Sequence, residues 1–268
     1  MPRFKLIVEY AGTRYSGWQI QKNARTIQGE IDRAVRTVTG RKDFELYGSG
    51  RTDAGVHALA QIAHLDVATN TPPEPLRRRL NDELPSDINV LSATIVPHRF
   101  HARHDAVARR YLYQIARRRT AFAKPFVWWV KDDLDAARMR DAAGLFVGMR
   151  DFQSFAAADK EADDDDGRSK STTVLVDRID IVENGDLIVV AIDGSHFLWK
   201  MVRRVVGVLV EIGRGGLTAE DAARFLAGRS PVPARLTAPA SGLFLERVVY
   251  DGDRRDATVA AATPLRSV

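Results

Sequence analysis

A carboxylate with an arginine two residues before it lies in the glycine-rich stretch GSGRTDAGVHA, residues 48–58. If the chain is extended there, Arg51 and Asp53 point to the same side and can pair, which keeps Asp53 ionised. An ionised carboxylate at the end of a strand is a candidate nucleophile or general base. The alternative is a plain hairpin corner, because Gly and Asp are common turn residues and a turn Asp mostly bonds its own backbone.

Several familiar active-site motifs do not fit this stretch. Gly50 and Gly55 have the spacing of a P-loop, but the two residues after Gly55 are not the Lys and Ser or Thr that a P-loop requires. The stretch also lacks the third glycine of a dinucleotide-binding fingerprint and the pattern of a serine nucleophile elbow. A triad of Ser49, Asp53 and His57 stays open, although nothing in the spacing specifies it.

Histidines at steps of three, His98, His101 and His104, raise the question of a metal site. On a strand, steps of three alternate between faces, so we expect the imidazoles not to converge. The chain contains no cysteine, which excludes thiolate zinc sites, disulfides and a Cys nucleophile. We therefore expect no metal, and histidines that lie at the surface or face RNA.

Basic residues are unevenly placed along a chain whose formal net charge is +5. Residues 98–119 hold seven Arg and one Asp, and within them ARRYLYQIARRR places Arg109 and Arg110 beside tyrosines. Guanidinium groups bind phosphates and aromatic faces stack on unpaired bases, so this strand is a candidate RNA-binding surface. A half-buried strand with a solvated outer face is the alternative. Further basic clusters are 77–79 and the group Lys200, Arg203 and Arg204.

The elements that must position Asp53 are two strands, near 44–48 and 58–67. Before them, 4–10 alternates as a strand, and apolar residues from Ile27 to Val38 recur at helical spacing and end at Gly40. A helix at 74–84 and a strand at 88–96 follow. The order is β-α-β-β-α-β, the split βαβ arrangement of one sheet with two helices.

The second half repeats this order, with a strand at 107–117 and a helix at 135–147. Asn184-Gly185 predicts a type I′ hairpin turn between two further strands. A helix from about Leu198 to Gly213 or Gly215, a shorter helix from Thr218 and a strand at 243–250 complete it. We therefore predict an α+β fold of two related subdomains, 1–105 and 106–268, whose sheets can join.

Three other stretches carry expectations about the surface and the location of the chain. Residues 159–166 hold six acids and one Lys, which predicts a surface loop, and the tail after 251 is expected to be loosely held. The opening MPRFKLIVEY has no apolar signal segment, and no uncharged apolar run approaches 20 residues. We expect a soluble, cytoplasmic protein with no membrane partner.

Four blocks of the sequence resemble one family. GSGRTDAGVHA, then ARRYLYQI, FLWKMVRRVVG and APASGLFL in that order, are similar to the tRNA pseudouridine synthase I family, which modifies the anticodon arm, and the likeness covers residues 4–250. It implies two ferredoxin-like subdomains that share a mainly antiparallel central sheet with helices packed on it. It also implies a homodimer that isomerises uridine to pseudouridine at tRNA positions 38, 39 and 40, without a metal or cofactor.

The resemblance assigns expected roles to particular residues. Asp53 matches the family's catalytic aspartate and Arg51 its neighbouring arginine. Tyr111 matches the active-site tyrosine, Arg203 the arginine that pairs with the aspartate, and Leu243 the apolar residue packed against the target base. The sequence departs from the family pattern between Asp159 and Lys170, where the chain is long and acidic.

Two other functions remain open at this point. A non-catalytic RNA-binding module would use the same basic and aromatic residues, but a carboxylate such as Asp53 is unfavourable near phosphates. A nucleoside or glycoside hydrolase would use Asp53 and release free uracil. The isomerisation gains and loses no atoms, so it needs neither a cofactor nor the second carboxylate with which a hydrolase activates water.

Overall fold

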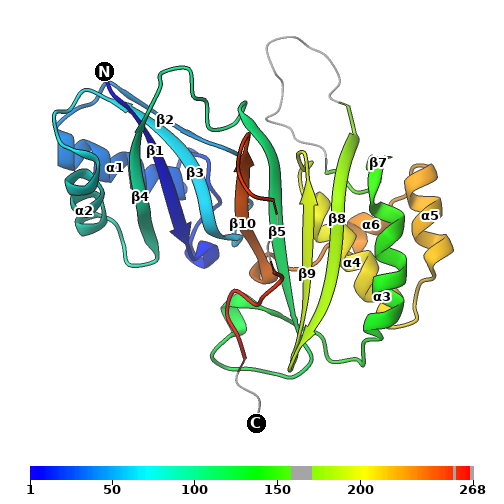
Figure 1. Ribbon diagram of the computed structural model, residues 1–268. Coiled ribbons are helices and arrows are strands. Elements are labelled where there is room, and N and C mark those ends of the chain that lie inside the picture. The colour runs from blue at the N-terminus through cyan, green and yellow to red at the C-terminus, as the bar shows by residue number, and fades with distance from the viewer. Residues whose placement is uncertain (158–170, 256–257, 266–268) are drawn as a thin grey trace. The chain divides into compact units, whose positions relative to one another are not determined.

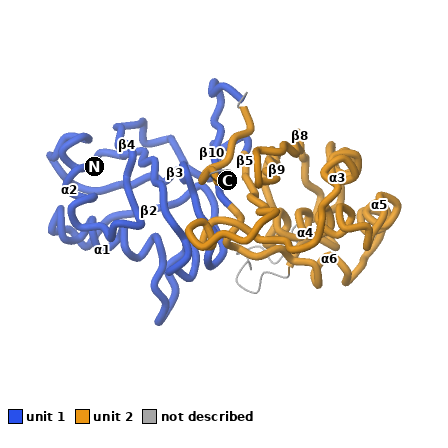
Figure 2. Tube along the Cα trace, turned by 90° about the horizontal axis from the view of Figure 1, so that it is seen from below, with its two compact units in different colours: residues 1–108, 244–256 blue, residues 109–243, 257–268 orange. Residues whose placement is uncertain are grey.

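The computed structural model describes residues 1–157, 171–255 and 258–265 (Figure 1). Within these residues the chain is mixed α+β, with ten strands that pair mostly antiparallel. It divides into two compact units, residues 1–108 with 244–256 and residues 109–243 with 257–268 (Figure 2). None of the described helices is long and apolar enough to cross a membrane. The acidic stretch 159–166 lies outside the described residues.

The first unit has the predicted β-α-β-β-α-β order. Its elements are β1 (Arg3–Tyr10), α1 (Ile27–Thr39), β2 (Phe44–Gly48), β3 (His57–Val67), α2 (Pro73–Glu83) and β4 (Ile88–Val96), followed far along the chain by β10 (Leu243–Tyr250). β1 lies between β4 and β3, antiparallel to both, and β2 is antiparallel to β3. β10 runs parallel to β3, with Phe244 opposite His57.

Local sequence explains these elements. Alternate residues of β1, from Phe4 to Tyr10, are buried, as expected for a strand with one face on the core. α1 begins at Thr26, whose side chain accepts a hydrogen bond from the Gly29 backbone, and ends at Gly40 in the left-handed conformation. α1 and α2 lie side by side and bury their apolar stripes (Figure 1).

The second unit carries its own strands and helices. They are β5 (Ala106–Ala116), η2 (Lys124–Phe126), β6 (Trp128–Trp129), α3 (Ala136–Ala143), η3 (Gly144–Phe146), β7 (Gly148–Asp151), β8 (Thr173–Asn184), β9 (Leu187–Gly194), α4 (Met201–Gly213), α5 (Ala219–Ala227), α6 (Val232–Arg235) and η4 (Ala240–Gly242). β9 lies between β5 and β8, antiparallel to both, and β7 pairs with the outer side of β8. α3 contacts both α4 and β8.

The hairpin between β8 and β9 differs from the type I′ turn that we predicted. Asn184 is still paired, opposite Leu187, so the two turn residues are Gly185 and Asp186. Gly185 has φ 57°, whereas Asp186 is not among the described residues with positive φ. A turn with glycine at the first central position and positive φ only there has the pattern of type II′.

The tail also differs from the prediction that it is loosely held. Thr263 lies against Gln114, a fully buried residue of β5. The Thr263 backbone N–H donates to Gln114 Oε1 at 3.1 Å, and Gln114 Nε2 donates to Thr263 Oγ1 at 2.8 Å. These two bonds attach the tail to a buried amide, which local sequence patterns do not reveal.

Candidate active site

Asp53 lies in an eight-residue loop, 49–56, that joins β2 to β3. The loop is longer than a hairpin corner, because β2 ends at Gly48, opposite Ala63, while β3 already begins at His57. The Asp53 side chain is half-buried, Arg51 is exposed and Thr52 between them is buried. The Val56 backbone N–H donates to the Asp53 carbonyl at 3.1 Å, so the chain turns directly after the carboxylate.

Residues 10–18, a distant segment of the same unit, hold this loop on both sides of Asp53. The hydroxyls of Tyr10 and Thr52 are 2.8 Å apart. The Trp18 backbone N–H donates to the Thr52 carbonyl at 3.1 Å, and the Gly55 N–H donates to the Tyr15 carbonyl at 3.3 Å. Because the residues on either side of Asp53 are bonded to a folded neighbour, the backbone that carries the carboxylate has little freedom to move.

Close approach of the two backbones requires glycine at position 17. Gly17 has φ +92°, and a Cβ at this position would lie 2.5 Å from the Thr52 carbonyl oxygen and 3.2 Å from the Asp53 carbonyl carbon. Any L side chain would therefore combine an unfavourable φ with a clash. This glycine, followed by the buried Trp18, is a site determinant that our sequence analysis missed.

Ser49 and His57 have structural partners at the two ends of the loop. The Ser49 hydroxyl donates to Gln61 Oε1 at 2.6 Å. The Gly12 backbone N–H donates to His57 Nδ1 at 3.1 Å, and the His57 ring stacks on Phe244 with centroids 4.7 Å apart. These contacts fix the Ser49 and His57 side chains at the two ends of the loop that carries Asp53.

Arg109 and Tyr111 lie on one face of β5, in the second unit, because side chains two apart on a strand point the same way. The Arg109 guanidinium donates to the Ser195 carbonyl at 2.9 Å. The half-buried Tyr111 ring meets Phe197 edge to face, with centroids 5.2 Å apart. Both side chains therefore contact the segment 195–200 that leads into α4.

Arg203, in the first turn of α4, holds a second segment of this unit. Its Nε donates to the Ala238 carbonyl at 2.7 Å, and the Ala238 N–H donates back to the Arg203 carbonyl at 3.0 Å. The next carbonyl along, that of Pro239, accepts from the Tyr113 hydroxyl at 2.7 Å. Burial raises the pKa of Tyr113, which keeps this hydroxyl a donor. The segment leads directly to Leu243, which is buried.

Arg110 is the predicted site residue that the structure reassigns. Its side chain is 1% exposed, on the strand face opposite to Arg109 and Tyr111, and its Nη1 is 3.6 Å from Asp193 Oδ2. A buried guanidinium has no surface to offer to a phosphate, so we no longer assign RNA contact to Arg110. The alternation of the strand explains this outcome, because neighbours in sequence must face opposite sides.

Two of the predicted basic clusters are partly neutralised or buried. In α2, Arg77 and Arg78 both bond to Glu74, at 2.7 and 3.0 Å. In α4, the Arg204 guanidinium donates to the Ala156 carbonyl at 2.5 Å, and burial lowers the pKa of this arginine. Lys200 keeps its Nζ 4.8 Å from the centre of the exposed Trp199 ring.

The histidines at steps of three do not lie on a strand, contrary to our expectation. They belong to the turns before β5. There the ring centres of His101 and His104 are 4.2 Å apart, and the ring centre of His64, from β3, is 4.8 Å from that of His101. Nδ1 of His101 accepts the backbone N–H groups of Arg103 and His104, and Nδ1 of His64 accepts that of Ala102. Within the described residues, no group of three or more His, Asp or Glu is placed to hold a metal ion.

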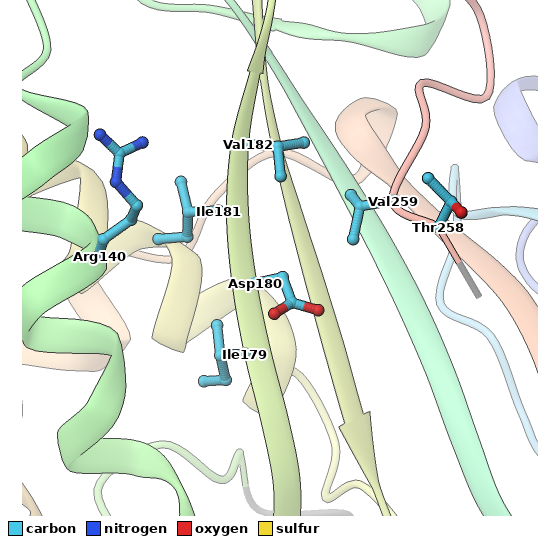
Figure 3. Close-up of a pocket in the computed structure, with 7 residues that line it drawn as sticks. All are labelled: Arg140, Ile179, Asp180, Ile181, Val182, Thr258 and Val259. Atoms are coloured by element: carbon cyan, nitrogen blue, oxygen red, sulfur yellow. The ribbon is translucent and has the colours of Figure 1, made fainter. Parts of the chain in front are cut away.

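A pocket in the second unit contains none of the predicted site residues (Figure 3). Its volume is about 380 Å³, and it lies beside β8, between α3 and the tail. It is lined by Arg140, Ile179, Asp180, Ile181, Val182, Thr258 and Val259. Its two charged groups are already paired, since Asp180 bonds to Arg178 and Arg140 to Glu183.

The predicted site residues therefore divide between the units. Arg51 and Asp53 belong to the first, whereas Arg109, Tyr111, Arg203 and Leu243 belong to the second. In the second unit the Arg109 and Arg203 side chains are held by backbone carbonyls, and in the first unit the backbone on both sides of Asp53 is held by residues 10–18. Enzymes position reacting groups by support of this kind. The first unit carries a carboxylate on a restrained loop. The second unit carries guanidinium groups and a tyrosine, which are side chains of the kind that bind phosphates and unpaired bases.

Comparison with known proteins identifies the chain as an RNA-modifying enzyme. The family model described as "tRNA pseudouridine synthase" matches residues 6–105 and 142–251. The chain therefore belongs to the tRNA pseudouridine synthase family, whose members are isomerases. This membership means that tRNA is the substrate and removes the alternative of a non-catalytic RNA-binding module.

Individual relatives match over almost their whole length. "tRNA pseudouridine synthase A" of Rhodopseudomonas palustris (strain BisA53) is 42% identical over 254 residues, which are 94% of this chain and 100% of the relative. The protein of the same name from Nitrobacter winogradskyi is 41% identical, over 94% of this chain and 97% of the relative. That from Agrobacterium fabrum is 39% identical, over 93% of both chains.

Proposed function

We propose that this enzyme converts uridine to pseudouridine at positions 38, 39 and 40 of the tRNA anticodon stem and loop, with Asp53 as its catalytic carboxylate. The observation that carries the proposal is the restraint of Asp53 within GRTDAGVHA. The carboxylate is half-buried, and the bonds of Thr52 and Gly55 to residues 10–18 hold the chain on either side of it. Such restraint suits a group that must meet one atom of the substrate.

The reaction breaks the bond between N1 and C1′, turns the uracil and joins C5 to C1′. Asp53 either attacks C1′ or stabilises positive charge on the sugar while the base departs. Water must be excluded, because it would trap the sugar and leave an abasic site. We assign the half-buried ring of Tyr111 to this exclusion of water, and Leu243 to the same role because of the resemblance stated above.

The remaining predicted residues have roles in holding the extruded nucleotide. Extruding a base from its stack costs roughly a few kcal/mol of free energy. Contacts between the enzyme and the extruded nucleotide must offset this cost. We assign Tyr111 to stacking on the base and to moving a proton. We assign Arg51 to filling the space that the base vacates or to holding a phosphate, and Arg203 to binding the substrate. Arg109, on the same strand face as Tyr111, binds a phosphate. Electrostatic binding of this kind weakens steeply with salt.

Three properties of the whole protein belong to the same proposal. The β-α-β-β-α-β order seen in residues 1–105 supports a ferredoxin-like fold for the first subdomain, and we propose a second one over 106–268. Shape and backbone contacts, rather than base edges, are the better basis for selecting three adjacent positions. We also propose a cytoplasmic homodimer that works without a metal or cofactor.

The decisive experiment uses tRNA transcripts labelled with tritium at C5 of uridine. Wild-type enzyme should release tritium and leave pseudouridine in the anticodon arm, whereas Asp53→Asn should bind the tRNA and release none. Asp43→Asn is the matched control, because Asp43 is an exposed carboxylate of the same unit outside the loop. Tritium release by Asp53→Asn at the wild-type rate would remove Asp53 from the mechanism, and free uracil as product would indicate a hydrolase.

Two further variants test the accompanying roles. Arg51→Ala and Tyr111→Phe should lower the single-turnover rate more than tRNA affinity, because each is assigned to the reacting nucleotide. Wild-type rates in either variant would show that its role is assigned wrongly, without affecting the role of Asp53.

A further inference from the structure

The segment 117–131, between β5 and α3 of the second unit, combines five cations with exposed aromatic rings. It contains Arg117, Arg118, Arg119, Lys124 and Lys131 and no acidic residue. The Phe122 side chain is 97% exposed and that of Trp129 is 42% exposed. An isolated exposed aromatic is ordinary, but two within eight residues of a purely basic segment are characteristic of nucleic-acid surfaces.

Phe122 is exposed although the segment around it is anchored. The neighbouring Ala123 is buried, and the Phe126 N–H donates to the Ala123 carbonyl at 2.8 Å. Gln114 Nε2 donates to the Phe126 carbonyl, and the Val130 N–H donates to the Ala116 carbonyl, at 2.8 and 3.0 Å. The Phe122 ring is therefore presented to solvent by a fixed backbone and contributes no burial to the fold.

The charges of the segment divide into two groups. Arg117 pairs with Glu183, and Arg118 pairs with Asp186 at 2.5 Å. Arg119 instead lies over the Trp129 ring, with its guanidinium carbon 5.9 Å from the ring centre, and Lys124 and Lys131 are exposed. The outer part of the segment thus presents a cation beside an aromatic face and two exposed lysines, which is complementary to a polyanion with flat apolar bases.

We propose that residues 119–131 form a second RNA-binding surface, on which an unpaired tRNA base stacks on Phe122 while Arg119 and Lys124 bind flanking phosphates. The proposal rests on tRNA as the substrate and is independent of the role given to Asp53. A second copy of the chain is a poorer partner for this surface, because the basic segments of the two copies would repel each other. Stacking on Phe122 is preferred to hydrogen-bond readout because its ring carries no polar group that could read a base edge.

The test measures tRNA affinity by filter binding at fixed salt for Phe122→Ala, Phe122→Leu and Phe122→Trp. Loss of a stacked base predicts a rise in Kd of about fivefold or more for Phe122→Ala. Leu keeps an apolar side chain without a π face, so it should also weaken binding, whereas Trp should bind as wild type does. Met149→Ala, which removes another exposed apolar side chain of the same unit, should leave Kd unchanged.

Several results would overturn the proposal. An unchanged Kd for Phe122→Ala, or wild-type affinity for Phe122→Leu, contradicts stacking on the ring. A change of sedimentation coefficient with an unchanged tRNA Kd would assign Phe122 to contact between copies of the chain. Phe122-dependent binding to phosphatidylglycerol vesicles, again with unchanged tRNA Kd, would assign it to a lipid surface. Because affinity is measured without turnover, a failure of the Asp53 assignment leaves this test intact.

Discussion

The hydroxyl of Tyr10, at the end of β1, lies 2.8 Å from the hydroxyl of Thr52, the residue before Asp53. Both side chains are buried. Two residues 42 positions apart in sequence thus form one hydrogen bond, which connects the first strand of the fold to the loop that carries the proposed catalytic carboxylate.

Removing this hydrogen bond should affect catalysis more than folding. Thr52→Val and Tyr10→Phe each delete one hydroxyl, and the loss of a typical hydrogen bond costs roughly 1 kcal/mol of unfolding free energy. A small displacement of Asp53 should lower the single-turnover rate of pseudouridine formation by about tenfold, since ångström-scale misplacement of reacting groups is costly. Quenched single-turnover assays measure the change in rate, and urea unfolding measures the change in stability.

The control for these variants is Thr37→Val, which removes an exposed hydroxyl in α1. The double variant Tyr10→Phe with Thr52→Val should cost little more than either single change, because both delete the same interaction. Additive losses, or wild-type rates in both single variants, would show that this bond does not position Asp53.

Gly17→Ala should damage both stability and activity. The new Cβ would meet the Thr52 carbonyl oxygen at 2.5 Å in a residue with φ +92°. Gly148→Ala is a matched control, because Gly148 has φ +91° and no atom within 4 Å of the added Cβ. In both variants the positive φ should lower the free energy of unfolding by roughly 1 to 2 kcal/mol. Only Gly17→Ala adds the clash, which should lower it by about 1 to 3 kcal/mol more.

The two glycine variants are compared by chemical denaturation and by tritium release. Gly148→Ala should keep wild-type turnover, whereas Gly17→Ala should lose most of it, because relief of the clash moves the backbone next to Asp53. Equal losses of unfolding free energy in the two variants would mean that the loop yields without strain, and the close approach would then have no role in positioning the carboxylate.

His64 predicts a dependence of stability on pH. Burial, together with the charges of Arg3 and His101, lowers the pKa of His64 from 6.5 to about 4, against the opposing effect of Asp66 and Asp105. Between these values the unfolded chain binds a proton that the folded chain does not. The contribution of His64 to the free energy of unfolding should therefore be fully present above pH 6.5 and be lost as pH falls toward about 4.

His64→Asn tests this contribution, because an Asn oxygen can still accept the Ala102 N–H that now donates to His64 Nδ1. The midpoint of urea unfolding, measured at several pH values, should fall as pH drops below about 6.5. This fall should be less steep in the variant than in the wild type. His98→Asn removes an exposed imidazole and should keep the wild-type slope. An unchanged slope in His64→Asn would mean that His64 titrates alike in the folded and unfolded chains.

Local patterns were enough to predict many elements. The strands at 88–96 and 243–250 have the predicted bounds, and the helix from Ile27 ends at Gly40 as expected. Patterns that depend on the path of the chain were less reliable. His101 and His104 come together because a turn replaces the strand that we assumed, and the hairpin turn moves one residue beyond Asn184 because Asn184 itself is paired.

The sequence by itself determined the family, the order of the elements and the motif that carries Asp53, because periodicity, capping residues and short motifs act over neighbouring positions. The tertiary structure alone decided that Tyr10 and Gly17 support the Asp53 loop, that Arg110 is buried beside Asp193, and that the Phe122 ring is exposed. Each of these depends on which distant backbone or side chain arrives at a given position. Hydrophobic periodicity specifies that a face is buried, but it does not specify the partner that buries it.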